Sequence, residues 1–234
     1  SSIQNWDTSS SIWTANKNPA TYQTYVQDSD IIMLGDLPGL TLKENISVNT
    51  ITRETQVDNN SNRIDFFFET NTTLTINGIL NGRGAGLDTT ERQINMNGPG
   101  AIGGDFDLQE AARIRLQGGL IAAPGAVLTT DNGGDIIIVN SVGDLSNLTL
   151  NITSSNDNNF IQFDKDNLTL GAMNGNGPLE DNSYAGFATI NSINPGEQSD
   201  GTGIGSFYPR PGSKTFNDDM ALGTGIHTFD INAD

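Results

Sequence analysis

The stretch NTTLTINGILNGRGAGL, Asn71 to Leu87, decides the fold. Its first half places two apolar residues, Leu74 and Ile76, on either side of one polar residue, and Asn77-Gly78 follow. Taken alone it predicts a β-hairpin, because Asn-Gly between alternating apolar residues is a strong hairpin signal. The surrounding sequence decides whether it is a hairpin or one turn of a repeat.

The same pattern of two apolar residues around one polar residue recurs along the chain. It begins at Leu74, Ile94 and Ile114, and again at Leu148 and Leu168, and within each group successive copies are displaced by ~20 residues, as in solenoid repeats. Residues two apart in a strand share a face, so each apolar pair faces a core and the polar residue faces out. Gly, Asn and Asp between the short apolar pieces suit sharp corners. A hairpin does not predict this displacement, and a repeat does.

The repeat predicts an all-β fold, a parallel β-solenoid or β-helix with rungs of ~20 residues that each hold three short strands. We expect a solenoid body over residues 31–194, a non-repetitive N-terminal cap over residues 1–30, and a Gly-rich C-terminal extension over residues 195–234. Within the cap, Pro19 to Gln27 has the spacing of a short helix. The residues expected to point inward are Ile76, Met96, Leu116, Leu150 and Leu170. The amides expected to stack on one another are Asn77, Asn97, Gln117 and Asn151.

Composition excludes several classes of function. The chain of 234 residues carries 11 Lys plus Arg against 28 Asp plus Glu, and its formal charge of −17 repels nucleic acid and anionic lipid. No apolar run reaches the ~18 residues of a membrane span. The absence of cysteine excludes disulfides and thiolate metal sites. The start SSIQNWDTSSS has no signal-peptide pattern, so we expect a mature, processed chain or a soluble protein.

Rungs such as LTINGILNG, INMNGPGAIGG and LTLNITSSN resemble those of β-solenoid surface proteins of Gram-negative bacteria. The families concerned are autotransporter passenger domains and filamentous-haemagglutinin-like adhesins. The resemblance lies in the style of the repeat and covers roughly residues 40–195. It implies a secreted protein displayed at the cell surface. Tailspikes and polysaccharide lyases share this architecture, so the fold alone does not assign a function.

Catalytic chemistry finds little support in the residues. The single histidine, His227, leaves no multi-histidine metal site and permits a Ser-His-Asp triad only through that position. Glycoside hydrolysis needs two carboxyl groups, and the candidate pairs are Asp105 and Asp107, Asp164 and Asp166, and Asp218 and Asp219. We therefore expect a non-catalytic protein. A carbohydrate-active enzyme or carbohydrate-binding module on the same scaffold is the alternative.

Two oxygen-rich segments are candidates for calcium, a hard cation that binds carboxylate, amide and carbonyl oxygens. The carboxylates that would bind it are Asp131, Asp135, Asp157 and Asp164. Neither segment has the spacing of an EF-hand loop or of the Gly-rich calcium-binding nonapeptide. Ordinary solvated turns are the alternative reading.

Asn-x-Ser/Thr sequons mark candidate glycosylation sites. The candidate acceptors are Asn45, Asn71, Asn147 and Asn167, and Asn59 and Asn151 also begin such motifs. A sequence rich in Asn and Thr also produces sequons by chance. Asn151 belongs to the expected amide stack as well, and one side chain cannot serve both purposes.

The two ends of the chain suggest assembly. Trp6 and Trp13 lie in the expected cap, and Ile226, Phe229 and Ile231 alternate in a segment that follows a Gly-rich run. This last segment would pair either with the final rung of its own chain or with a neighbouring copy, and the second arrangement builds filaments. The sequence therefore predicts an extracellular structural or adhesive protein that forms a homo-oligomer or filament, with a glycan or host-surface ligand as a further partner.

Overall fold

The structure is a computed structural model, and it describes residues 3–14, 22–34, 39–54, 63–81, 93–109, 113–130, 136–152, 160–163, 168–175, 179–180, 188–195, 206–208, 214–216 and 228–229. These residues form strands, turns and irregular segments, with no helix among them. No helix in this part of the chain is therefore long and apolar enough to cross a membrane. The all-β prediction is confirmed. The helix expected up to Gln27 is wrong from Tyr22 onward, because Tyr22–Gln23 forms a short strand that pairs with Trp13–Thr14.

One sheet has ten strands, and the order across it follows the order along the chain. Its members are β1 (Gln4–Trp6), β5 (Gly39–Leu42), β7 (Arg63–Phe68), β9 (Gln93–Asn97), β12 (Arg113–Gly118), β15 (Ile136–Ser141), β18 (Phe160–Phe163), β20 (Leu179–Glu180), β22 (Ser206–Tyr208) and β24 (Thr228–Phe229). Each neighbouring pair is parallel.

The second sheet has twelve strands. Its members are β4 (Ser29–Leu34), β6 (Ile46–Glu54), β8 (Thr73–Asn81), β10 (Ala101–Gly103), β11 (Asp105–Gln109), β13 (Ile121–Ala122), β14 (Ala126–Thr130), β16 (Asp144–Leu145), β17 (Leu148–Ile152), β19 (Leu168–Gly175), β21 (Ala188–Pro195) and β23 (Lys214–Phe216). Its pairs are parallel too. The antiparallel pair is β2 (Trp13–Thr14) with β3 (Tyr22–Gln23).

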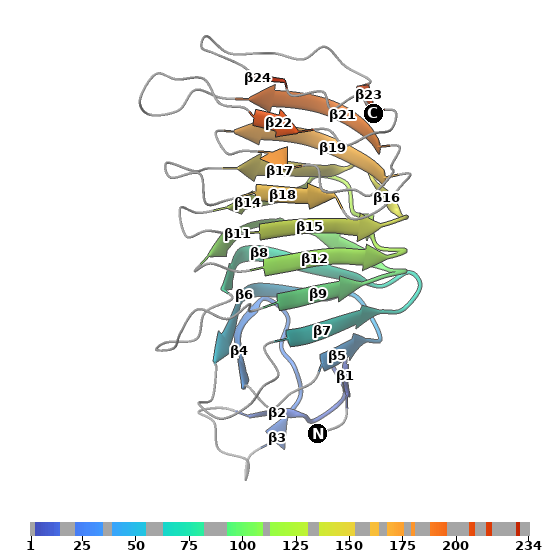
Figure 1. The fold of residues 1–234 in the computed structure, drawn as a ribbon. Coiled ribbons are helices and arrows are strands. Elements are labelled where there is room, and N and C mark those ends of the chain that lie inside the picture. The colour runs from blue at the N-terminus through green and yellow to red at the C-terminus, as the bar shows by residue number, and fades with distance from the viewer. Residues whose placement is uncertain are drawn as a thin grey trace.

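From β4 onward the chain alternates between the two sheets. We call one strand of the ten-stranded sheet, together with the strands of the other sheet that follow it, a pass. Figure 1 shows the passes stacked in chain order, from the blue strands at the N-terminal end to the red strands at the C-terminal end. Two parallel strands need a long return connection between them, and the strand in the opposite sheet supplies it.

The displacement seen in the sequence holds for one step of the ten-stranded sheet, where Ile114 pairs with Ile94. The preceding step joins Ile64 to Ile94, and the following step joins Ile114 to Ile137. Both of these steps span more of the sequence than the step between them. The length of a pass therefore varies, while the pairing within the sheet stays in register.

Two of the registers inferred from the repeat are wrong. Leu74 pairs with Ile102 rather than Ile94, because Leu74 and Ile94 lie in different sheets. Leu150 pairs with Met173 rather than Leu170. In both cases two segments displaced by ~20 residues have the same apolar-polar-apolar pattern, but other strands have this pattern too. Local alternation does not identify which strand is the neighbour.

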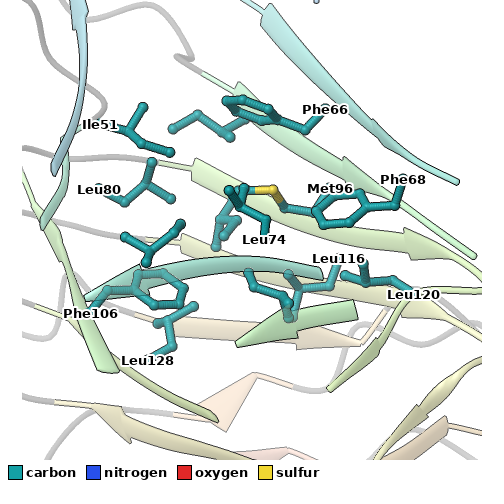
Figure 2. Close-up of a cluster of buried hydrophobic side chains, with 14 of the residues drawn as sticks. Ile51, Phe66, Phe68, Leu74, Leu80, Met96, Phe106, Leu116, Leu120 and Leu128 are labelled. Atoms are coloured by element: carbon teal, nitrogen blue, oxygen red, sulfur yellow. The ribbon is translucent and has the colours of Figure 1, made fainter. Parts of the chain in front are cut away.

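The core lies between the two sheets and contains the residues expected there. Ile76, Met96, Leu116, Leu150 and Leu170 are all completely buried, which confirms their inward orientation. Figure 2 shows side chains from both sheets meeting in this core, with Met96 and Leu116 from one and Leu74, Leu80 and Phe106 from the other. Burial of each such side chain is worth ~1.5–3 kcal/mol.

The expected amide stack exists in one place. The Gln117 side-chain amide donates to Asn97 Oδ1, and these residues pair in register across β9 and β12. Asn77 instead donates to Ser47 Oγ, and Asn151 donates to Thr129 Oγ1, each at 3.3 Å. The stack is therefore wrong for Asn77 and Asn151, because both lie in the twelve-stranded sheet.

Candidate functional site

The outer face of the twelve-stranded sheet carries one of the predicted carboxylate pairs. Asp105 and Asp107 on β11 are exposed, whereas Phe106 and Leu108 between and beyond them are buried. This alternation confirms that the two carboxylates share a face. Across the sheet, Asp107 pairs in register with Thr129, whose hydroxyl accepts the hydrogen bond from Asn151. The result is a polar row of carboxylate, hydroxyl and amide groups at strand spacing, ~4.8 Å.

This row has the oxygen and nitrogen groups that bind sugar hydroxyls. Among the described residues, no group of three or more His, Cys, Asp or Glu side chains could hold a metal ion. The other two carboxylate pairs, Asp164 with Asp166 and Asp218 with Asp219, lie outside the described residues, and so does His227.

The predicted calcium ligands also lie outside the described residues. They are Asp131, Asp135, Asp157 and Asp164. Calcium binding by their two segments stays a prediction from sequence.

An aromatic cluster covers the N-terminal end of the core. The Trp6 ring lies 5.4 Å from the rings of both Trp13 and Tyr25, and 6.0 Å from that of Phe66, measured between centroids. Trp6 is completely buried, and Trp13 is half-buried. Tilted and edge-on ring contacts of this kind are favourable beyond the apolar area they bury. The two tryptophans singled out from the sequence therefore meet in one cluster with Tyr25.

Tyr25 ties this cluster to the twelve-stranded sheet. Its hydroxyl donates to the Ser47 carbonyl oxygen at 2.7 Å. Burial, with a smaller contribution from the charges of Asp28 and Asp30, raises the pKa of Tyr25 to about 12. The phenol therefore stays protonated and keeps its donor at physiological pH.

Among the side chains that the structure describes, most of the large apolar ones that are exposed belong to the N-terminal part of the chain. Six large apolar side chains are exposed among the described residues, and four of them lie between residues 3 and 32: Ile3, Tyr22, Val26 and Ile32. We call these four the N-terminal apolar residues. The remaining two, Ile121 and Val142, lie in the middle of the chain. Sequence reasoning missed this set, although Ile32 carries a signal, since it is apolar between the inward-facing Ile31 and Met33.

The predicted assembly residues lie at opposite ends of the ten-stranded sheet. Phe229 is in β24, which pairs with β22 of the same chain, and Trp6 is in β1 at the other end. Ile226 and Ile231 lie outside the described residues. Since Trp6 is completely buried, it would assist assembly by supporting exposed neighbours rather than by touching another chain.

The described sequon asparagines occupy turns where the chain leaves one strand for the next. Asn45 and Asn147 immediately precede β6 and β17, and Asn71 lies two residues before β8. All three are exposed. Asn151 lies within β17, and Asn59 and Asn167 are outside the described residues.

The chain was compared with family models, with curated proteins and with solved structures, and none of the three comparisons found a match.

Proposed function

We propose that this chain is a single parallel β-solenoid that acts outside the cell as a non-catalytic structural or adhesive protein and joins other copies end to end. Support for the solenoid comes from the alternation of the chain between two parallel sheets whose strands follow chain order. In such a fold no pass can bury its own apolar side chains, and stacked neighbours complete the core. The Trp6 cluster supports a cap at one end, assigned to residues 1–30.

End-to-end assembly is supported chiefly by the exposed apolar residues at the N-terminal end. An edge strand presents backbone donors and acceptors that pair readily with another chain. β1 and β24 are the edge strands at the two ends of the ten-stranded sheet, and all its pairs are parallel. A second copy stacked in the same orientation would therefore continue the parallel pairing. The N-terminal apolar residues would become buried in that contact, which is a reason for them to be apolar.

Because β24 pairs with β22 of its own chain, the contact needs no exchange of the last strand. The C-terminal edge of one molecule would meet the N-terminal edge of the next directly. Such a contact is heterologous, and it extends into a filament unless its rotation closes a ring.

Adhesion is supported by the outer face of the twelve-stranded sheet. The row of Asp107, Thr129 and Asn151 offers acceptors and donors at regular spacing, with no apolar residue among the three. A repeating glycan or an extended host-surface polymer presents hydroxyl groups that such a row would bind. The extracellular location rests on the resemblance in repeat style to secreted surface proteins.

The assembly proposal is tested with two valines that differ in position. Val26 is 67% exposed at the N-terminal end, and Val142 is 56% exposed in the middle of the chain. We expect the wild-type protein to sediment as multimers and to show filaments by electron microscopy. Val26→Asp should shift the population to monomers, because an end contact would bury the new charge. Val142→Asp is the matched control and should assemble like the wild type.

A protein truncated after Thr224, which removes β24, should also fail to assemble while its monomers stay folded. Monomeric wild-type protein at high concentration would contradict assembly. An equal effect of Val26→Asp and Val142→Asp would place the contact elsewhere on the surface.

A carbohydrate-active enzyme or carbohydrate-binding module is the second candidate, favoured by the shared exposed face of Asp105 and Asp107. Two carboxyl groups on one face are the minimum for glycoside cleavage. Release of reducing sugar from a panel of polysaccharides would support it if the activity disappears in Asp105→Asn and Asp107→Asn. Asp144→Asn, at another exposed aspartate, is the control. Retention of activity in all three variants would exclude this pair.

A further inference from the structure

Two of the exposed sequon asparagines bind the backbone of a neighbouring pass. Asn45 Oδ1 accepts a hydrogen bond from the Thr73 backbone N–H at 2.9 Å. Asn147 Nδ2 donates to the Ala122 carbonyl oxygen at 3.3 Å. Each amide thus joins the start of its strand to a neighbouring layer of the stack.

The rest of these two motifs follows from strand alternation. The second residue of each, Ile46 or Leu148, is buried in the core, and the third, Ser47 or Thr149, is on the outer side of the strand. An asparagine at the corner is thus followed by a core residue and then by a Ser or Thr on the outer side of the strand, and this order gives the sequence Asn-x-Ser/Thr. The fold therefore accounts for both motifs without a glycan.

Asn71 is different. It is exposed in the turn between β7 and β8, its φ is +66°, and no hydrogen bond joins its side chain to a described residue. The backbone and Thr72 hold this turn: Thr72 N and Thr72 Oγ1 donate to the Glu69 carbonyl oxygen, and Ala101 N donates to that of Thr72. Glycine or aspartate would also tolerate this backbone conformation, so the turn does not require the amide.

We propose that Asn71 is an N-glycan acceptor of this chain and that Asn45 and Asn147 are structural amides. In the reaction, Asn71 Nδ2 loses a proton and bonds to the anomeric carbon of a sugar carried on a lipid pyrophosphate, and the lipid pyrophosphate leaves. Thr73 supplies the hydroxyl residue of the motif. The inference goes beyond the proposed function and draws on it only for the extracellular location, which gives the chain access to an oligosaccharyl transferase.

Folding selects between the three acceptors. Transfer precedes folding, so all three motifs meet the transferase, but the modified chain must then fold. A sugar on Asn147 Nδ2 would occupy the place of the Ala122 contact. A sugar on Asn45 Nδ2 would be attached to the same side-chain amide whose Oδ1 accepts the hydrogen bond from Thr73 in the neighbouring strand. A sugar on Asn71 displaces no hydrogen bond among the described residues and projects from the turn into solvent.

The experiment is secretion of the full chain from mammalian cells, followed by peptide mapping before and after peptide-N-glycosidase treatment. Deglycosylation converts a modified Asn to Asp, so the mass shift of each peptide reports occupancy site by site. We expect the shift at Asn71 in most secreted molecules and at Asn45 and Asn147 in a small minority. Asn71→Gly, which keeps the positive φ, and Thr73→Ala should each abolish the shift at residue 71.

Two results would overturn the proposal. One is secreted, folded protein with unmodified Asn71. The other is equal occupancy of Asn45 and Asn147 in protein whose melting temperature matches that of the unmodified chain. Melting temperatures of unglycosylated protein from bacteria give an independent reading: Asn45→Gln and Asn147→Gln should lower it, and Asn71→Gly should not. None of these measurements requires filaments, so they can fail or succeed separately from the assembly proposal.

Discussion

The middle of the molecule and its N-terminal end bury apolar side chains by different means. In the middle, Met96 on β9 pairs in register with Leu116 on β12, and each pass provides the surface on which the next one packs. At the N-terminal end, β1 is the edge strand of the ten-stranded sheet among the described residues, and the rings of Trp6, Trp13 and Tyr25 cover the core. A stacked fold thus repeats one solution along its length and needs a separate one at its end.

The two solutions leave different surfaces. In the part of the chain that the structure describes, the middle passes expose two large apolar side chains, Ile121 and Val142, whereas the N-terminal end exposes four: Ile3, Tyr22, Val26 and Ile32. Contiguous exposed apolar patches commonly mark contacts with other molecules, whereas apolar side chains exposed singly are normal. The buried rings cover the core at this end, and contact of the exposed residues with another copy stays our proposal.

The largest expected effect is at the centre of the stack. Leu116→Asp would bury a carboxylate among apolar side chains with no partner, which costs several kcal/mol and should unfold the chain or lead to aggregation. Thr149→Asp, at a half-buried position on the outer side of β17, is the control and should cost far less, about 1 kcal/mol. Circular dichroism during thermal unfolding measures both. A soluble Leu116→Asp protein with an unchanged melting temperature would contradict the inward assignment.

The next effect is at the N-terminal cluster. Trp6→Ala should cost ~3–5 kcal/mol, because it leaves a cavity between the remaining rings. Trp13→Ala removes a half-buried ring and should cost less. Denaturant unfolding of the two variants gives both free energies. Equal losses of unfolding free energy in the two variants would mean that Trp6 contributes no more than Trp13 to covering the core at this end.

A smaller effect is expected at a glycine where neighbouring passes approach closely. A Cβ on Gly104, whose φ is +91°, would lie 2.1 Å from the Ile76 carbonyl oxygen. Gly104→Ala should therefore cost roughly 2–4 kcal/mol through backbone strain and overlap together. Gly125 also has a positive φ, +76°, but a Cβ there meets nothing within 4 Å. Gly125→Ala should cost about 1 kcal/mol, and similar values for the two variants would contradict the close approach.

The smallest effect is a pH dependence at Tyr25. Its pKa of about 12 in the folded protein exceeds the ordinary value of 10.0. The neutral phenol therefore stabilises the fold fully below pH 10, and this contribution is lost as the pH rises through 12. Because solvent screens a group that is only partly enclosed, the loss relative to Tyr25→Phe, which cannot ionise, should stay below the full value of the shift, at about 1–2 kcal/mol. Denaturant unfolding between pH 9 and 12 tests it, and parallel curves for the two proteins would show that the phenol does not titrate between those limits.

Alternation within strands was predictable because it is local. Asp105 and Asp107 share an exposed face and Ile76 and Leu150 point inward, as their spacing predicted. The parallel, all-β character followed from the same pattern. The solenoid itself stays our proposal. The helix up to Gln27 failed because Tyr22 and Tyr25 have helical spacing, yet Tyr22 pairs in a short strand and Tyr25 packs on Trp6.

Some candidate sites were predicted and others were missed, because only some of them have a local signal in the sequence. Trp6 and Trp13 were identified together because tryptophan is rare in this chain, which has two. The exposed Val26 was missed because nothing in the residue itself distinguishes an exposed apolar side chain from a buried one. The sequons were found as motifs, but their meaning depended on partners such as Ala122, which is 25 residues from Asn147.

By itself, the sequence determined which side chains face the core and which face water, because strand geometry turns a period of two into two faces. It did not determine which strands are neighbours. Leu74 pairs with Ile102 in one sheet and Ile94 pairs with Ile114 in the other, and the first two residues are further apart in the sequence than the second two. The segments that connect the strands differ in length, and many strands offer the same local pattern to a partner. Only the packing of complete passes on one another decides the register, the close contacts between layers and the residues left exposed at the end.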